Sequence, residues 1–111
     1  IAGLITYRVS GEVCEITSLD SLREGLGIGT DLLEKVIAIA REMGCHKITL
    51  VTTNDNIHAI RFYQKQGFDL VRLHHYSIKQ ARGLKPEIPL FGQNGIPIEH
   101  ELEFEFLLEN G

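Results

Sequence analysis

The stretch Ser21-Leu-Arg-Glu-Gly-Leu-Gly-Ile-Gly-Thr30 carries glycines at three alternate positions, 25, 27 and 29. Because glycine has no Cβ, the backbone here can turn tightly and approach a ligand closely. A helical apolar pattern follows at once, and the first amides of a helix lie unpaired at the positive end of its dipole. The stretch therefore predicts either a phosphate-binding loop or a plain turn from strand to helix. Its spacing matches neither the dinucleotide pattern G-x-G-x-x-G nor a P-loop.

Hydrophobic periodicity on both sides of this loop predicts an alternation of strands and helices. Runs that alternate apolar and polar residues indicate strands, and apolar residues three or four apart indicate helices. The predicted elements are strands at 1–9, 12–19, 47–53, 68–76 and 99–108, helices at 28–43, 57–66 and 77–84, and a proline-rich loop at 85–97. The strand–helix–strand order across residues 12–53 implies a parallel strand pair with a right-handed crossover. The predicted fold class is therefore α/β.

Two of these strands have an informative side-chain pattern. In strand 12–19, simple alternation places Glu15, Thr17 and Leu19 on one face. In strand 99–108, glutamates occupy every second position from Glu99 to Glu105. We expect these glutamates to form a solvated face, which could also attract a cationic partner.

Length, charge and cysteine content limit the class of protein. The 111 residues suit one domain, and 43% hydrophobic with 23% charged residues is typical of a soluble globular chain. A net charge of −4 argues against nucleic-acid binding, and no apolar run is long enough to span a membrane. No signal-like segment opens the chain, so we expect a cytoplasmic protein. We expect Cys14 and Cys45 to be small buried residues. No set of candidate ligands has the spacing of a metal site, so we expect no metal.

A pair of motifs, in order along the chain, narrows the fold further. The first is Glu24-Gly-Leu-Gly-Ile-Gly29, and the second is Asn56-Ile-His-Ala-Ile-Arg-Phe-Tyr-Gln-Lys-Gln-Gly-Phe68. Together they resemble the pyrophosphate loop and the late helix of the GNAT superfamily of N-acetyltransferases. The resemblance covers residues 1–76 best and implies a GNAT-like acyl-CoA N-acyltransferase fold, with a mixed, mostly antiparallel sheet flanked by helices. The family's first strand and two helices are missing ahead of residue 1, so we expect either a fragment or a homo-oligomer that pairs an exposed sheet edge.

The resemblance also implies acetyl-CoA as cosubstrate and a set of residues that bind it. The backbone of Leu19 would hold the pantetheine, and amides near the start of the helix would hold the pyrophosphate. Asn56 would contact the cofactor arm, although asparagine is also a common helix cap. Glu24 departs from the family, where Gln or Arg is usual, and its carboxylate would have to turn away from the pyrophosphate. The full predicted set is Leu19, Glu24, Gly25, Leu26, Gly27, Ile28, Gly29, Thr30 and Asn56.

Two residues are candidates for the chemistry itself. Tyr63 matches the family tyrosine that protonates the departing thiolate, and its alternative role is core packing. Glu15 is the candidate base that takes a proton from the attacking amine, and its alternative is a solvated strand residue. The implied function is direct transfer of an acetyl group to an amine acceptor, either a small molecule or a peptide. The alternatives are a non-catalytic acyl-CoA-binding module and an interaction domain that has lost its ligand.

Overall fold

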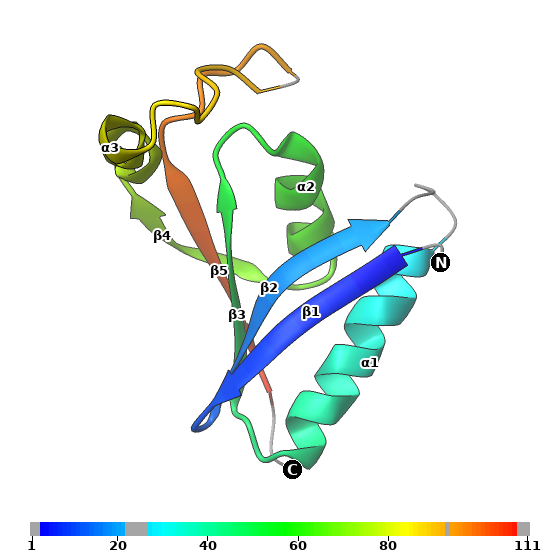
Figure 1. Ribbon diagram of the computed structural model, residues 1–111. Coiled ribbons are helices and arrows are strands. Elements are labelled where there is room, and N and C mark those ends of the chain that lie inside the picture. Colours follow the sequence, from blue (N-terminus) through cyan, green and yellow to red (C-terminus); the bar gives the residue numbers. More distant parts are fainter. Residues whose placement is uncertain (1–2, 22–26, 93, 109–111) are drawn as a thin grey trace. The chain divides into compact units, whose positions relative to one another are not determined.

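The computed structural model describes residues 3–21, 27–92 and 94–108. The chain forms two compact units, the first made of residues 1–50 with 105–111 and the second of residues 51–104. The described strands belong to one mixed five-stranded sheet with the order β1-β2-β3-β5-β4 (Figure 1). Strands β3 (Lys47–Thr53) and β5 (Glu101–Leu107) each run through both units. This sheet with its three helices confirms the predicted α/β class.

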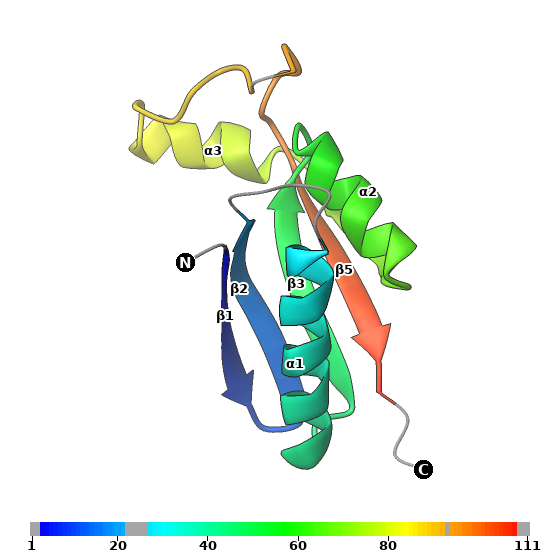
Figure 2. The same cartoon turned by 90° about the vertical axis from the view of Figure 1, so that its right-hand side faces the viewer.

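The first unit contains the hairpin of β1 (Gly3–Ser10) and β2 (Val13–Ser21), followed by helix α1 (Ile28–Glu42). Gly11 makes the hairpin turn with a φ of 61°, a left-handed conformation that suits glycine. The predicted parallel pair is confirmed, since β2 and β3 pair from Val13–Lys47 to Glu15–Thr49. Helix α1 lies against the face of β1 and β2 (Figure 2).

A β-bulge in β2 overturns the predicted face of one site residue. Thr6 lies opposite Ser18 while Tyr7 lies opposite Ile16, so Thr17 is an extra residue. One extra residue shifts the alternation by one position. Leu19 therefore shares the face of Ile16, and the expectation that it shares a face with Glu15 is wrong.

The core of the first unit lies between α1 and the sheet. Leu33, Val36 and Ala40 of the helix are buried, as are Cys14 and Ile48 of the strands. Both cysteines are free and buried, which confirms their predicted packing role. At Gly3, a Cβ would lie 2.8 Å from Ile28 Cγ2, so the helix packs against a strand position without a side chain.

The second unit contains α2 (Ile57–Lys65), β4 (Asp69–His74) and α3 (Ser77–Leu84), followed by the proline-rich loop. Its aromatic core is centred on Tyr63, whose ring lies 5.4 Å from Phe68 and 6.4 Å from Phe104. The predicted strand 47–53 and helix 77–84 match to the residue, and the other described boundaries lie within two residues of those predicted.

The glutamates of β5 are less solvated than the alternating pattern predicts. Glu103 is 19% exposed and accepts hydrogen bonds from Arg72 at 3.0 Å and His74 at 2.9 Å. The hydrogen bond with His74 lowers the pKa of Glu103 below its usual value. Glu105 is 24% exposed and pairs with Lys47 at 3.2 Å. Basic side chains of the neighbouring strands β3 and β4 therefore pair with these glutamates, and the sequence of β5 alone does not reveal those contacts.

Candidate functional site

The start of α1 in the first unit has the features of an anion site. Gly27 is the N-cap with a φ of 75°, and no side chain caps the helix. The amide of Asp31 makes the first helical hydrogen bond, to the carbonyl of Gly27 at 2.9 Å. The amides of Ile28 and Gly29 come before Asp31 in the chain, so no carbonyl of the helix lies one turn behind them. They point out of the helix start, at the positive end of the helix dipole. Such an arrangement suits a phosphate group.

Four of the predicted pyrophosphate residues form this helix start. They are Gly27, Ile28, Gly29 and Thr30. The other three, Glu24, Gly25 and Leu26, lie outside the described residues, so the position of the unusual Glu24 carboxylate stays untested.

Leu19 lies beyond the section of β2 that pairs with β3. Its partner in the hairpin is Ile5 of β1, whereas the described pairing with β3 ends at Glu15 and Thr49. The backbone N–H and C=O groups of a strand point alternately to its two sides, so only some of those near Leu19 form hydrogen bonds with β1. The remaining groups in this unit suit hydrogen bonds to a ligand amide such as that of pantetheine.

Glu15 lies on the same face of the hairpin as Arg8 and forms an ion pair with it. The side chain of Arg8 is 70% exposed and that of Glu15 is 38% exposed. An exposed pair of this kind is weak, on the order of 0–1 kcal/mol. Glu15 is therefore accessible, but Arg8 occupies its carboxylate. This partner was not predicted from the sequence.

Tyr63 lies on the buried side of α2 in the second unit. It is 6% exposed, and its ring contacts Phe62 edge-on at 5.2 Å as well as Phe68 and Phe104. Burial raises the pKa of Tyr63 to about 12. The phenol therefore stays protonated at neutral pH, which both the acid role and the packing role require.

Asn56 is the N-cap of α2, seven residues before Tyr63. Its Oδ1 accepts a hydrogen bond from the amide of Ala59 at 3.2 Å, and its Nδ2 donates to Thr52 Oγ1 at 3.3 Å. Seven residues of helix span about 10 Å, so Asn56 and Tyr63 act at separate points along α2. The capping role of Asn56 is confirmed, and the cofactor role stays a prediction.

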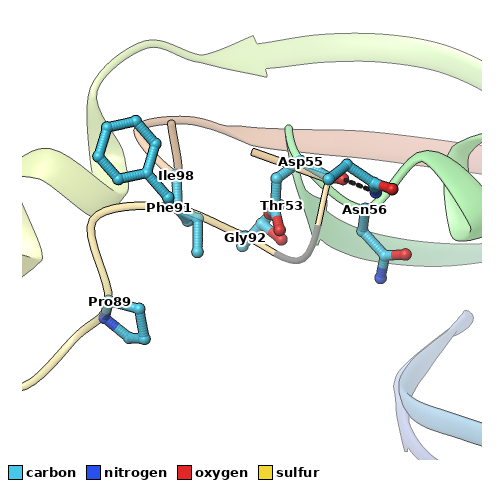
Figure 3. A pocket seen from close by; sticks show the side chains of 8 residues that line it. Thr53, Asp55, Asn56, Pro89, Phe91, Gly92 and Ile98 are labelled. Atoms are coloured by element: carbon cyan, nitrogen blue, oxygen red, sulfur yellow. Dashed lines mark hydrogen bonds between the residues drawn. The ribbon is translucent and has the colours of Figure 1, made fainter. Parts of the chain in front are cut away.

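A pocket of about 450 Å³ opens beside Asn56, entirely within the second unit (Figure 3). Thr53, Asp55 and Asn56 line one side of it, and Phe91 and Pro89 of the proline-rich loop lie apart from them. This pocket was not predicted from the sequence. An acidic residue directly before an asparagine cap was the available signal.

Two other kinds of feature are absent from the described residues. Among them, no group of three or more His, Cys, Asp or Glu side chains is placed to hold a metal ion. None of the helices in the described part of the chain is long and apolar enough to cross a membrane.

Comparison with known proteins assigns the family. Residues 1–68 match the Acetyltransferase (GNAT) family, and the chain belongs to that family. The uncharacterized protein YxbD of Bacillus subtilis is 55% identical over 102 residues, which are 92% of this chain and 64% of YxbD. The uncharacterized protein YdhI of the same organism is 47% identical over 109 residues, which are 98% of this chain and 68% of YdhI. The chain thus spans only part of the length of these relatives.

A solved structure confirms the predicted GNAT-like fold. The crystal structure of a Bacillus subtilis acetyltransferase in complex with CoA has a TM-score of 0.82. It is 23% identical to this chain, and the match covers 98% of this chain and 70% of that one. At this identity the likeness shows the fold, and the roles of single residues need their own arguments.

Proposed function

We propose that the protein transfers the acetyl group of acetyl-CoA to an amine acceptor by direct attack. The observation that carries this proposal is the uncapped start of α1 at Gly27, in a chain of the GNAT family. An anionic pyrophosphate would satisfy the helix amides that no side chain caps. A cosubstrate with this group therefore fits the residues present.

The proposed reaction forms an amide bond and breaks a thioester bond. The amine nitrogen attacks the acetyl carbonyl and loses a proton to a base, for which Glu15 is the candidate. The sulfur leaves as a thiolate and takes a proton from an acid, for which Tyr63 is the candidate. Tyr63 has the protonation state needed for this role. Glu15 must release Arg8, or act through water, to take a proton.

A thermal unfolding experiment tests the cosubstrate site. Acetyl-CoA at about 100 times its dissociation constant should stabilise the folded state by about 2.7 kcal/mol. Gly29→Asp should abolish this stabilisation because it puts a negative charge at the helix start. The same charge favours the free helix, so folding should survive.

Ala38→Asp provides the matched control, since Ala38 is exposed within the same helix. It should leave the acetyl-CoA stabilisation intact. Equal stabilisation of the Gly29→Asp and Ala38→Asp variants would contradict the proposed site, as would no stabilisation of the unmodified protein.

The ion pair between Glu15 and Arg8 favours one second candidate, a non-catalytic acyl-CoA-binding module. Such a module would gain stability from acetyl-CoA without releasing CoA thiol in the presence of any amine. A thiol-release assay across an amine panel separates the two functions.

Self-association and cytoplasmic location are further parts of the proposal. Strand β4 is the last strand in the described sheet order, and its Leu70 and Leu73 are 51% and 55% exposed. An exposed apolar edge of this kind favours pairing with another copy. Light scattering of the purified protein tests the first part, and fractionation of the producing cells tests the second.

A further inference from the structure

The pocket of the second unit points to the acceptor class. We propose that it binds a cationic group of a small organic acceptor, with Asp55 as the counter-ion, and that this group is distinct from the amine that is acetylated. The inference rests on the proposed function for the identity of the reaction, but the binding step can be tested without it.

Hydrogen bonds of Arg82 hold the pocket wall in place. This side chain of α3 donates to the carbonyls of Ile88 at 3.1 Å, Pro89 at 2.8 Å and Ile98 at 2.6 Å. The amide of Ile98 also donates to the carbonyl of Leu90 at 3.0 Å, which closes the loop on itself. The loop side of the pocket is therefore built before a ligand arrives, and this limits the ordering cost of binding.

The opposite wall, at the end of β3, is fixed to the same loop. Asn54 Nδ2 donates to the carbonyl of Pro97 at 2.9 Å, and Asn54 Oδ1 accepts from the amides of Glu99 and His100 at 3.0 Å. The backbone carbonyl of Asp55 accepts a hydrogen bond from Asn94 Nδ2 at 3.3 Å. These bonds hold Asp55 at the pocket wall.

One oxygen of the Asp55 carboxylate lacks a hydrogen-bond partner in the described part of the chain. This atom is Oδ1, which is buried. The other oxygen, Oδ2, lies against Gly92, where a Cβ would overlap the carboxylate. A carboxylate with one buried oxygen that makes no hydrogen bond is costly, and a cationic ligand in the pocket would offset part of this cost by neutralising the charge.

The remaining lining favours an organic cation. Among the described lining residues, Asp55 is the only one with a charge, and none is Lys, Arg or His. Phe91, which is 60% exposed, offers an aromatic face that attracts cations, and Ile98 adds an apolar surface. The volume of about 450 Å³ suits a small molecule.

The proposal assigns the cation on Asp55 and the reacting amine to different nitrogens. A carboxylate partner favours the charged ammonium and raises its pKa. An ammonium nitrogen has no lone pair with which to attack a thioester. The acceptor class is therefore a small amine that carries a second cationic group, such as a diamine.

A matched pair of acceptors tests this class. In 4-aminobutanol, a hydroxyl replaces the second ammonium of 1,4-diaminobutane. We expect a KM at least tenfold lower for 1,4-diaminobutane, and Asp55→Asn should remove that advantage while leaving the KM for 4-aminobutanol unchanged. Asp69→Asn, the same change at an exposed position of β4, should keep the advantage. Equal KM values for the two acceptors, or equal effects of Asp55→Asn on both, would overturn the proposal.

A non-reactive probe separates binding from chemistry. Phenyltrimethylammonium cannot be acetylated, so calorimetry without acetyl-CoA measures the pocket alone. Asp55→Asn and Phe91→Leu should each weaken its binding at least fivefold. Probe binding that depends on Asp55 would support the cation pocket even if acetyl-CoA fails to bind. Undiminished probe binding in both variants would refute the cation pocket, even if the protein proves to be an active acetyltransferase. A lowered melting temperature of Asp55→Asn with unchanged probe binding would show that the carboxylate serves the start of α2 instead.

Discussion

Replacing Tyr63 with Phe removes one oxygen and nothing else from the aromatic core of the second unit. Because the ring stays packed against Phe62, Phe68 and Phe104, the lost stability should be no more than about 1 kcal/mol. If the phenol protonates the leaving thiolate, kcat should fall by about 10²–10⁴-fold with little change in the affinity for acetyl-CoA. A thiol-release assay with a saturating amine, beside thermal unfolding of the same sample, measures both quantities.

The raised pKa of Tyr63 provides an independent check of its environment. The folded-state pKa is about 12, above the ordinary value of 10.0. The neutral phenol therefore stabilises the folded state fully below pH 10, and this contribution is lost as pH rises through 12. The shift corresponds to about 2–3 kcal/mol, and the Tyr63→Phe variant should not show this loss. Denaturant unfolding at pH 9 and pH 11.5 measures the difference between the two proteins.

Two outcomes would refute the reasoning about Tyr63. An unchanged kcat in a folded Tyr63→Phe protein would leave packing as its only role. A large loss of stability, on the order of the 3–5 kcal/mol typical of deleting a whole buried aromatic side chain, would show that the activity loss reports unfolding. Tyr63→Ala is the reference for that second case.

Three further predictions follow from the packing of both units. The pKa of Glu103 is lowered, so this residue should stabilise the fold at pH values above its ordinary pKa of 4.5. That stabilisation should be lost as pH falls through the lower pKa of the folded state. The stability of Glu103→Gln in acid should therefore depend less on pH. Gly92→Ala should displace the Asp55 carboxylate and weaken phenyltrimethylammonium binding. Gly83→Ala is the control, because an added Cβ there would meet open space; it should raise helix stability by about 0.5–1 kcal/mol and leave binding unchanged. Leu33→Ala, at a site only 1% exposed, should cost about 2–5 kcal/mol in denaturant unfolding, and a loss below 1 kcal/mol would contradict the core assignment.

The local pattern of the sequence determined most of the elements. The β-branched run 47–53 and the apolar spacing of 28–43 each fix one kind of structure, because a strand repeats every two residues and a helix every 3.6. Glycines 27 and 44 mark the two ends of α1 for the same local reason, since both have a positive φ. The motifs at 24–29 and 56–68 were enough to predict the family that the comparisons show.

Tertiary structure decided what alternation and motifs cannot. The bulge at Thr17 places Leu19 on the face opposite Glu15, and a bulge depends on how two strands align and not on one strand's sequence. Arg8 reaches Glu15, and Arg72 reaches Glu103 from 31 residues away, only because the strands that carry them lie side by side. Asp55 and Gly92 are likewise far apart in sequence, and the folded loop brings Gly92 against one oxygen of the Asp55 carboxylate. The sequence by itself thus determined the elements and the family, while the ion pairs and the pocket beside Asn56 arise from long-range packing.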